Sequence, residues 1–472
     1  MNSLQQTLSA QLHDKSLHCQ AQQAAFDYLD ALACRRVFPD EQALKALSVF
    51  EEDLPEQRGD AQHVIALLAK EGANATVAQN GGRYFGFVNG NALPVTLATK
   101  WLADVWDQNS ALYLMSPISA KLEDVCQRWL NQLLGLPMHT VAGFVSGTSV
   151  ATLSGLAAAR YRQHQKLGWD INRQGMFAAP RLRLILGRQT HGTVAKAISL
   201  LGFGSDNIEW VDCDEQGRLL VACLPKLDEH CILVLQAGNE NSGAFDYFSQ
   251  ICPLAKAAGA WVHIDGAFGL WAAASSHFAA LTHGFEQADS WSVDAHKTLN
   301  TPYDCGIILC QDAQALTAAL HQQGSYIQYS EEAVQKRDGM VFTPEMSRRA
   351  RGTELWSALK FLGREGVCEL VFQLHDHAQY LAQCLSKTDF TVLNDVVFNQ
   401  VIICCENDLL TTQTLEFVQQ SGEIWCGPSR WFDQAVIRLS ICSWATERSD
   451  IDHAVSTLLD CKTRAVDALA NR

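Results

Sequence analysis

Apolar residues recur at helical spacing through the first part of the chain, from about residue 20 to residue 70. Phe26, Leu29 and Leu32 lie three residues apart, and Val64 and Leu67 repeat the pattern further on. This spacing places apolar side chains on one face of a helix. The pattern therefore predicts a helical N-terminal segment.

Between residues 143 and 310 the pattern changes to short apolar runs that alternate with amphipathic stretches. The runs read LRLILG, IEWVDC, CILVLQ, AWVHID, SWSVDA and CGIILC. Short apolar runs separated by helical patterns are typical of strands joined by helices. This part of the chain is expected to form a parallel sheet covered by helices.

Helical periodicity returns over residues 349–362, and beyond it the strand-like runs VVFNQVIICC and AVIRLSIC mix with helices. A smaller α+β unit is expected there. A chain of 472 residues is too long for one ordinary core. We expect three parts: an N-terminal helical segment at residues 1–95, a large domain at 96–365 and a small C-terminal domain at 366–472.

The composition narrows the possible partners and environments. A net charge of −15 disfavours binding to phosphate backbones or anionic lipid, so we expect no nucleic-acid or membrane partner. The first fifteen residues lack the basic start and apolar core of a secretion signal, and a cytoplasmic protein is expected. The 16 cysteines include no CxxC pair, which favours reduced thiols, and no ligand cluster predicts a metal.

Two of the apolar runs end in reactive polar groups. WVHIDGAFG at residues 261–269 contains Asp265, and SWSVDAHKT at residues 290–298 contains His296 and Lys297. The carboxyl ends of neighbouring parallel strands line one crevice, so Asp265 and Lys297 are expected to face the same ligand. A structural salt bridge is the commoner role of such a pair. The small and polar residues around Lys297 favour instead a lysine that acts as an imine-forming nucleophile.

A third run meets a helix in AGFVSGTSVATLSGLAAAR, residues 142–160. Gly147, Thr148 and Ser149 stand where the apolar run gives way to an alanine-rich helix. A helix N-terminus offers unpaired N–H groups and the positive end of a dipole, so it can bind phosphate, and the two hydroxyls add donors. The same residues also serve as ordinary helix caps.

His191 begins an amphipathic helix after a strand in ILGRQTHGTVAKAISLLG, residues 185–202. An isolated histidine is usually a structural residue. At the mouth of the same crevice, an imidazole can instead stack on a flat heteroaromatic ring and hold it against a small apolar side chain such as Ala267. His191 and Ala267 are therefore candidates for the two sides of a planar cofactor.

The ordered set His191, Asp265-Gly266-Ala267 and His296-Lys297 resembles the group II pyridoxal-dependent decarboxylases, which include the aromatic-amino-acid, glutamate, histidine and diaminobutyrate decarboxylases. The resemblance continues through SPISAKLEDVCQRWL, AGNENSGAFD, SRRARGTELW and RLSICSWAT. It implies an α/β protein of the aspartate-aminotransferase-like fold, fold type I, with a large parallel-sheet domain, a helical N-terminal segment and a small α+β C-terminal domain. It also implies pyridoxal 5′-phosphate as cofactor and a homodimer.

The resemblance implies a role for each candidate residue. Lys297 carries the cofactor as a Schiff base, Asp265 pairs with the pyridine nitrogen, and His191 stacks on the ring and is a candidate for assisting protonation. His296 and the turn at residues 147–149 hold the phosphate. A carboxylate keeps the ring nitrogen protonated, so the ring can accept electrons from a breaking bond to Cα. The expected reaction is decarboxylation of an L-amino acid to its amine through a quinonoid intermediate.

The chain departs from the family pattern at two places. Phe342, in RDGMVFTPEMSRRAR, stands where relatives often carry a loop tyrosine that helps to protonate Cα, and phenylalanine has no proton to give. Either Tyr326, Tyr329 or His191 supplies the proton, or the intermediate meets another fate such as reaction with oxygen. Glu240 stands where relatives carry small residues or threonine, and it either favours a cationic substrate or points into solvent.

Three residues are candidates for the substrate pocket: Phe85, Phe342 and Arg351. The aromatic group at residues 84–87 either lines the pocket of the neighbouring subunit in the expected dimer or fills a core. One guanidinium of the run at residues 348–351 is expected to meet a carboxylate, unless these arginines form solvent-facing ion pairs.

Other functions fit less well. Gly202 and Gly204 follow a helix instead of a strand and lack the third glycine of a dinucleotide-binding fingerprint, and Thr193 stands where a P-loop needs lysine. On the same fold, aminotransfer, carbon–carbon lyase chemistry and oxygen-dependent decarboxylation with deamination stay open. A degenerate ligand-binding scaffold is the non-enzymatic alternative, and the intact Lys297 and Asp265 argue against it.

Overall fold

The computed structural model describes residues 3–320 and 336–471, so Tyr326 and Tyr329 lie outside the described residues. The chain divides into two compact units. The first comprises Met1–Phe87, Cys404–Ile437 and Ala445–Arg472, and the second comprises Val88–Ile403 and Arg438–Trp444.

The first unit is mainly helical. Its elements are α1 (Leu4–Asp14), α2 (Ser16–Ala31), α3 (Glu41–Ala46), α4 (Ala61–Leu67), α14 (Asp408–Ser421), β10 (Gly427–Trp431) and α15 (Arg448–Ala470). The first four confirm the predicted helical N-terminal segment. None of them contains a fully buried residue: Phe26 and Val64 are exposed, whereas Leu29, Leu32 and Leu67 are partly buried.

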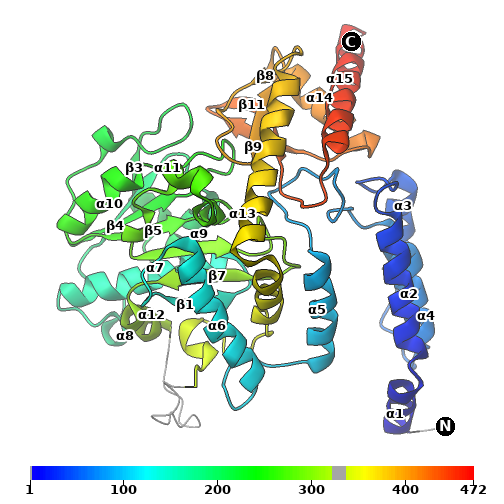
Figure 1. Ribbon diagram of the computed structural model, residues 1–472, viewed down its shortest axis with the longest axis horizontal. Coiled ribbons are helices and arrows are strands. Elements are labelled where there is room, and N and C mark those ends of the chain that lie inside the picture. The colour runs from blue at the N-terminus through cyan, green and yellow to red at the C-terminus, as the bar shows by residue number, and fades with distance from the viewer. Residues whose placement is uncertain (1–2, 321–335, 472) are drawn as a thin grey trace. The chain divides into compact units, whose positions relative to one another are not determined.

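The second unit is built around a seven-stranded sheet with the order β1-β7-β6-β5-β4-β2-β3 (Figure 1). The strands are β1 (Val141–Val145), β2 (Arg183–Gly187), β3 (Ile208–Val211), β4 (Cys231–Gln236), β5 (Trp261–Asp265), β6 (Ser290–Asp294) and β7 (Gly306–Cys310). Strands β2 to β6 pair in parallel, as the sequence pattern predicts. The exception is β7, which is antiparallel to both β1 and β6.

The reversed direction of β7 follows from the connection that precedes it. Residues 295–305, between β6 and β7, contain no helix. A parallel pair needs a crossover of about a dozen residues or more, usually with a helix. The shorter connection therefore returns β7 antiparallel, and it carries Lys297 beside the end of the sheet.

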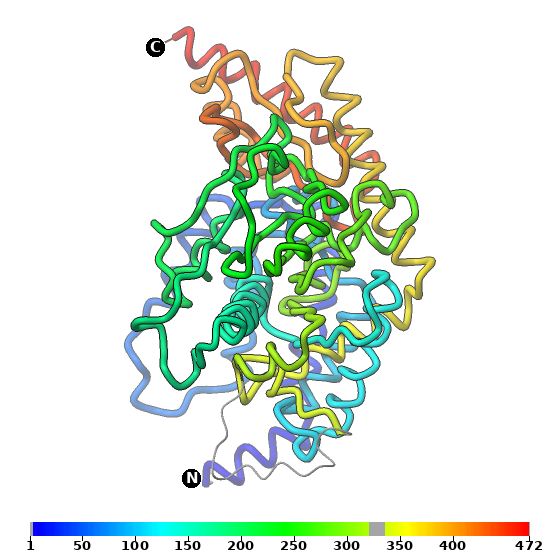
Figure 2. The backbone as a smooth tube through the Cα atoms, turned by 90° about the vertical axis from the view of Figure 1, so that its left-hand side faces the viewer, coloured from blue at the N-terminus to red at the C-terminus, as the bar shows by residue number. Residues whose placement is uncertain are grey.

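Helices cover both faces of this sheet (Figures 1 and 2). The helices of this unit are α5 (Pro94–Trp106), α6 (Pro117–Leu134), α7 (Thr148–Lys166), α8 (Ile171–Gln174), α9 (Gly192–Leu200), α10 (Phe248–Ala257), α11 (Ala279–Thr282), α12 (Ala313–Leu320) and α13 (Gly352–Leu385). In β4, Ile232 and Val234 belong to the apolar cluster of α7, α9 and α12, whereas Leu233 and Leu235 belong to that of α6, α10 and α13. A strand covered on both faces is apolar at every position, which explains the run CILVLQ.

The strand-like runs near the C-terminus form part of a second sheet. Its order is β10-β11-β9-β8, with β8 at Thr391–Val392, β9 at Gln400–Cys404 and β11 at Gln434–Ser440. These strands follow the long helix α13, so the predicted mixture of helices and strands is confirmed. Among the described residues, no helix combines the length and apolar character of a membrane span.

Candidate functional site

The carboxyl ends of β5 and β6 bring Asp265 and Lys297 to one edge of the sheet. Asp265 is the last residue of β5, and β5 pairs in parallel with β6, whose last residue is Asp294. Lys297 follows three residues later, and its carbonyl accepts a hydrogen bond from the Asn300 side chain at 3.1 Å. Asp265 and Lys297 interact electrostatically, so these two residues lie in one site.

Asp294 links this lysine to the N-terminus of α7. One carboxylate oxygen accepts the N–H of Thr148 at 2.7 Å, and the Thr148 hydroxyl donates to the other. The same carboxylate lies 3.1 Å from Nζ of Lys297 and 3.7 Å from Nε2 of His296, and its side chain is only 2% exposed. Sequence analysis missed Asp294, although a carboxylate at a strand end, three residues before the lysine, was visible.

The N-terminus of α7 carries the turn at residues 147–149 for which the sequence predicts phosphate binding. Gly147 is the residue before the helix and provides no side-chain cap, while Thr148 and Ser149 begin the first turn. A Cβ atom on Gly306 would lie 2.3 Å from the Cα atom of Gly147, so the two backbones approach closely because Gly306 lacks a side chain. His296 and Lys297 lie beside this helix end, and in this structure both donors of Thr148 are directed at Asp294, so phosphate binding by this turn stays a prediction.

Asp265 is a buried carboxylate, and a positive charge beside it would stabilise its ionised form. Burial raises its pKa, whereas His191 and Lys297 oppose that rise through their charges. The N–H of Ala267 donates to it at 3.2 Å. A protonated ring nitrogen placed against this carboxylate would stabilise its charged form. The half-buried Ala267 lies two residues further along the same turn.

His191 stands at the start of α9 and its ring contacts two groups. Nδ1 accepts the N–H of Thr193 at 3.2 Å, and Nε2 lies 3.1 Å from Oε2 of Glu240. Burial lowers the pKa of His191, with a smaller opposing contribution from the charge of Asp265. The structure therefore places His191 in the electrostatic environment of Asp265 and Lys297.

His296 is fixed by the connection that carries Lys297. Its Nδ1 lies 3.0 Å from the nitrogen and 3.1 Å from the carbonyl oxygen of Cys305, and its ring centroid lies 4.4 Å from that of Tyr303. Burial lowers the pKa of His296. Nε2 faces Asp294 at 3.7 Å.

The three substrate candidates lie in different surroundings. Phe85, in the first unit, is fully buried, and its N–H donates to the carbonyl of Trp425 at 2.8 Å. Phe342 ends a short 3-10 helix (Gly339–Phe342), and the Arg337 guanidinium lies 4.7 Å above its ring. Both aromatic rings therefore have packing partners within the chain.

The arginines of the run 348–351 each have a carboxylate partner. Arg348 and Glu123 form a two-pronged ion pair in which both side chains are 1% exposed. Arg351 lies at the start of α13 with Nε 3.2 Å from Asp304, and its Nη1 is buried without a hydrogen-bond partner among the described residues. These pairs are largely buried, which differs from solvent-facing ion pairs on a helix.

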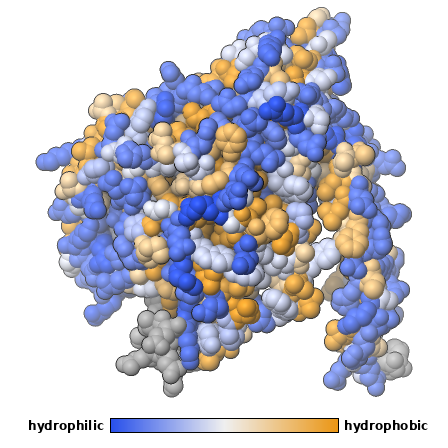
Figure 3. All heavy atoms as spheres, viewed as in Figure 1, coloured by the Kyte–Doolittle hydropathy of each residue, from blue (hydrophilic) through white to orange (hydrophobic). Residues whose placement is uncertain are grey.

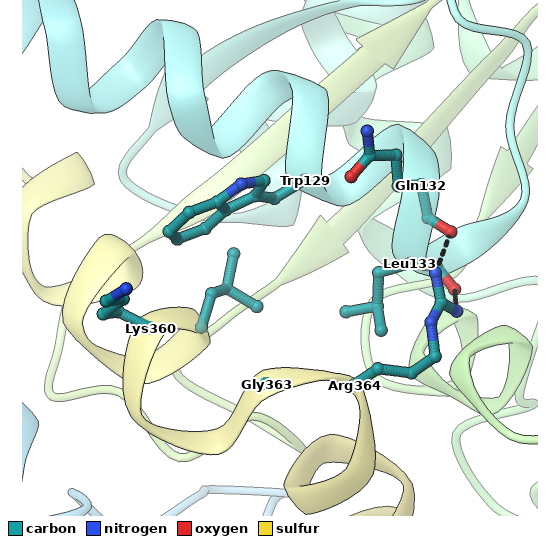
Figure 4. Close-up of a pocket in the computed structure, with 7 residues that line it drawn as sticks. Trp129, Gln132, Leu133, Lys360, Gly363 and Arg364 are labelled. Atoms are coloured by element: carbon teal, nitrogen blue, oxygen red, sulfur yellow. Dashed lines mark hydrogen bonds between the residues drawn. The ribbon is translucent and has the colours of Figure 1, made fainter.

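A separate cavity of 310 Å³ lies between α6 and α13 (Figure 4). Trp129 and Leu133 line it from α6, and Arg364 donates to the carbonyls of Gln132 and Leu133 beside it. Gly363 interrupts α13 there with a φ of 58°, which favours glycine. The cavity shares no residue with the cluster around Lys297. Within residues 3–320 and 336–471, no grouping of His, Cys, Asp and Glu suits a metal ion.

Most of the chain matches a known protein family. Residues 47–405 match the family model of the pyridoxal-dependent decarboxylase conserved domain. The aromatic-L-amino-acid decarboxylase of Bacillus atrophaeus is 28% identical over 342 residues, which cover 70% of this chain and 68% of that protein.

Two solved structures share the fold. The crystal structure of Oryza sativa TDC with PLP and tryptamine has a TM-score of 0.88 at 20% identity, covering 95% of this chain and 97% of that one. Rhodiola rosea 4-hydroxyphenylacetaldehyde synthase has a TM-score of 0.79 at 19% identity, covering 98% and 99%. The family match spans most of the sequence and includes the strand ends that carry Asp265 and Lys297. The chain belongs to the pyridoxal-dependent decarboxylase family and is a pyridoxal-phosphate-dependent amino-acid decarboxylase.

Proposed function

We propose that this enzyme converts an L-amino acid to its amine and carbon dioxide, with Lys297 as the residue that binds the cofactor covalently. The observation that carries the proposal is the convergence of Lys297, Asp265 and His191 beside the N-terminus of α7. Each of these groups comes from a different strand end or helix start. Together they provide an amine, a buried carboxylate, an imidazole and an anion-binding helix end.

The residues of this cluster fit pyridoxal 5′-phosphate. When bound, the cofactor supplies an electron sink for the bond that breaks at Cα of the substrate. Asp265 would hold a proton at the ring nitrogen, because its buried carboxylate is stabilised by a positive charge. His191 and Ala267 would cover the two ring faces, while His296 and residues 147–149 would bind the phosphate.

The source of the proton that Cα needs after carbon dioxide leaves distinguishes two reactions. Phe342 has no proton to donate, and its ring packs under Arg337. Oxygen-dependent decarboxylation with deamination is therefore the second candidate, and one solved structure of the same fold is an aldehyde synthase. An oxygen electrode separates the two candidates: amine without oxygen uptake supports the first, and aldehyde with oxygen uptake supports the second.

We also propose a homodimer, from the apolar residues that the N-terminal helices expose (Figure 3). Leu4, Leu8 and Leu12 recur every four residues along α1 and are 54% to 60% exposed. An apolar face of this kind is normally covered in a stable protein, and a second copy of the chain would cover it. Light scattering at the mass of one chain, 52.0 kDa, would contradict this proposal.

The first experiment compares absorbance spectra of the wild type, Lys297→Ala and the control Lys121→Ala, whose lysine is exposed. The wild type and the control are expected to show the band of lysine-bound cofactor, and Lys297→Ala is expected to lack it. Amino acids are then added while carbon dioxide, amine and oxygen are monitored. A band in all three proteins would reject Lys297 as the cofactor lysine, and a wild type that releases no carbon dioxide would reject the proposed reaction.

A further inference from the structure

Glu240 contacts His191 from the turn that follows β4. Its Oε2 lies 3.1 Å from Nε2 of His191, and its side chain is 33% exposed. The Oε2 atom itself is buried and takes part in no hydrogen bond among the described residues. The imidazole of His191 is thus a polar group beside this buried oxygen. The two side chains lie in contact without a hydrogen bond between them.

The other ring nitrogen of His191 has a fixed role. The N–H of Thr193 donates to Nδ1 at 3.2 Å, and the Thr193 hydroxyl lies 2.6 Å from the same atom. A backbone N–H can only donate, so Nδ1 must keep its lone pair. In the neutral ring the proton therefore sits on Nε2, the nitrogen that faces Glu240.

The turn that carries Glu240 is tied to the loop that carries His191. The Asn239 side chain donates to the carbonyl of Gln189 at 2.9 Å, and its oxygen accepts the N–H groups of Asn241 and Ser242 at 2.9 and 3.2 Å. The carbonyl of Glu240 accepts a hydrogen bond from Arg438 at 3.1 Å. These bonds fix the backbone from which the Glu240 carboxylate reaches the imidazole.

We propose that Glu240 is a positioning residue that, with Thr193, holds the His191 ring in one orientation and one tautomer. This role rests on the proposed function, in which the His191 ring covers the cofactor. Turning the ring about its Cβ–Cγ bond would break the hydrogen bond at Nδ1 and move Nε2 away from the Glu240 carboxylate. This role gives the sequence Asn239-Glu240-Asn241 a function. The Asn239 side chain holds the turn by hydrogen bonds, and the Glu240 carboxylate contacts His191.

The contact with Glu240 also bears on the protonation of His191, because a carboxylate lies 3.1 Å from Nε2. Besides Glu240, the charged groups that act on this ring are Asp265 on β5, Asp294 and Lys297 at the end of β6, and Arg438 on β11. Asp265 and Asp294 raise the pKa of His191, whereas burial, Lys297 and Arg438 lower it. A carboxylate 3.1 Å from Nε2 favours the protonated ring, so its removal lowers the pKa of His191 further.

The test compares Glu240→Gln and Glu240→Ala with a matched control, Glu423→Gln. Glu423 lies 3.0 Å from Nε2 of His453 in the first unit, so the control removes the same kind of carboxylate from another histidine. Two readouts do not depend on turnover. One is the circular dichroism of the bound-cofactor band, which reports ring geometry, and the other is the rate at which diethyl pyrocarbonate modifies His191, followed by mass spectrometry across pH.

We expect the midpoint of His191 modification to fall by about one pH unit in Glu240→Gln, because the neutral amide no longer stabilises the imidazolium. Glu240→Ala is expected to lose, in addition, much of the circular dichroism per bound cofactor, and Glu423→Gln is expected to match the wild type in both readouts. Unchanged His191 modification and unchanged dichroism in both Glu240 variants would overturn the proposal. The modification profile is measured in the apoenzyme as well, so failure of the wild type to bind cofactor would refute the proposed function without deciding this contact.

Discussion

His263 allows a quantitative prediction about the pH dependence of stability. It lies inside β5 and is fully buried, with Nδ1 2.8 Å from the Ser290 hydroxyl and Nε2 3.3 Å from the Ser292 hydroxyl. A Cβ atom on Gly155 of α7 would lie 2.7 Å from its ring, so the packing is tight. Burial lowers the pKa of His263 to about 3, and the folded protein therefore keeps this ring neutral down to acidic pH.

The sign and the size of the effect follow from the two pKa values. In the unfolded chain the value is 6.5, so below that pH the unfolded state binds a proton that the folded state does not. The stabilising contribution is therefore present above pH 6.5 and is lost as the pH falls toward 3. At pH 5 the gap is 1.5 pH units, which corresponds to about 2 kcal/mol at about 1.36 kcal/mol per unit.

The assay is urea unfolding of the wild type and His263→Asn at pH 7 and pH 5, at fixed protein and cofactor concentrations. Asparagine keeps a polar partner for Ser290 and does not titrate in this range. The variant is expected to be less stable at pH 7 because it leaves a cavity, but the difference should shrink by about 2 kcal/mol at pH 5. Asp246 and Asp289, whose pKa values burial raises to about 6, give an opposite slope that is the same in both proteins.

His283 is an exposed histidine, and His283→Asn serves as the control for the same substitution outside the core. The wild type and His263→Asn could differ in free energy of unfolding by the same amount at pH 7 and at pH 5. That result would refute the reasoning, because it would mean that the His263 ring takes up its proton in the folded state.

Three further predictions concern the groups around the site. Glu123→Gln leaves the buried Arg348 without its carboxylate partner and should lower the free energy of unfolding in urea by about 3–5 kcal/mol. Glu41→Gln, at an exposed ion pair, should change the free energy of unfolding little, and equal effects of the two substitutions would contradict the burial argument. Asp294→Ala removes the acceptor at the start of α7 and should cost about 1 kcal/mol by thermal unfolding, most of which Asp294→Asn should restore. Gly306→Ala places a Cβ atom against the backbone before α7 and should weaken cofactor binding in fluorescence titration, while Gly59→Ala, with open space around it, should bind as the wild type does.

The sequence alone was sufficient to predict the layered architecture and to identify the polar residues that stand at the ends of strands. The apolar runs of β4 and β5 are local signals, because a strand buried on both faces must be apolar at each position. Asp265 and Lys297 could be assigned to one edge because parallel strands share the direction of their carboxyl ends. Family resemblance added the expected roles, since His191 and His296-Lys297 occur in the same order as in pyridoxal-dependent decarboxylases.

Only the tertiary structure decided which of these residues touch and in which direction β7 runs. The carboxylate of Asp294 reaches Thr148, 146 residues away along the chain, and Arg348 meets Glu123 across 225 residues. Such contacts depend on strand register, helix position and side-chain rotamers, none of which leaves a periodic trace in the sequence. Hydrophobic periodicity is set by local burial and can be read along the chain, whereas polar contacts are set by distances that exist only after the sheet and its helices have packed.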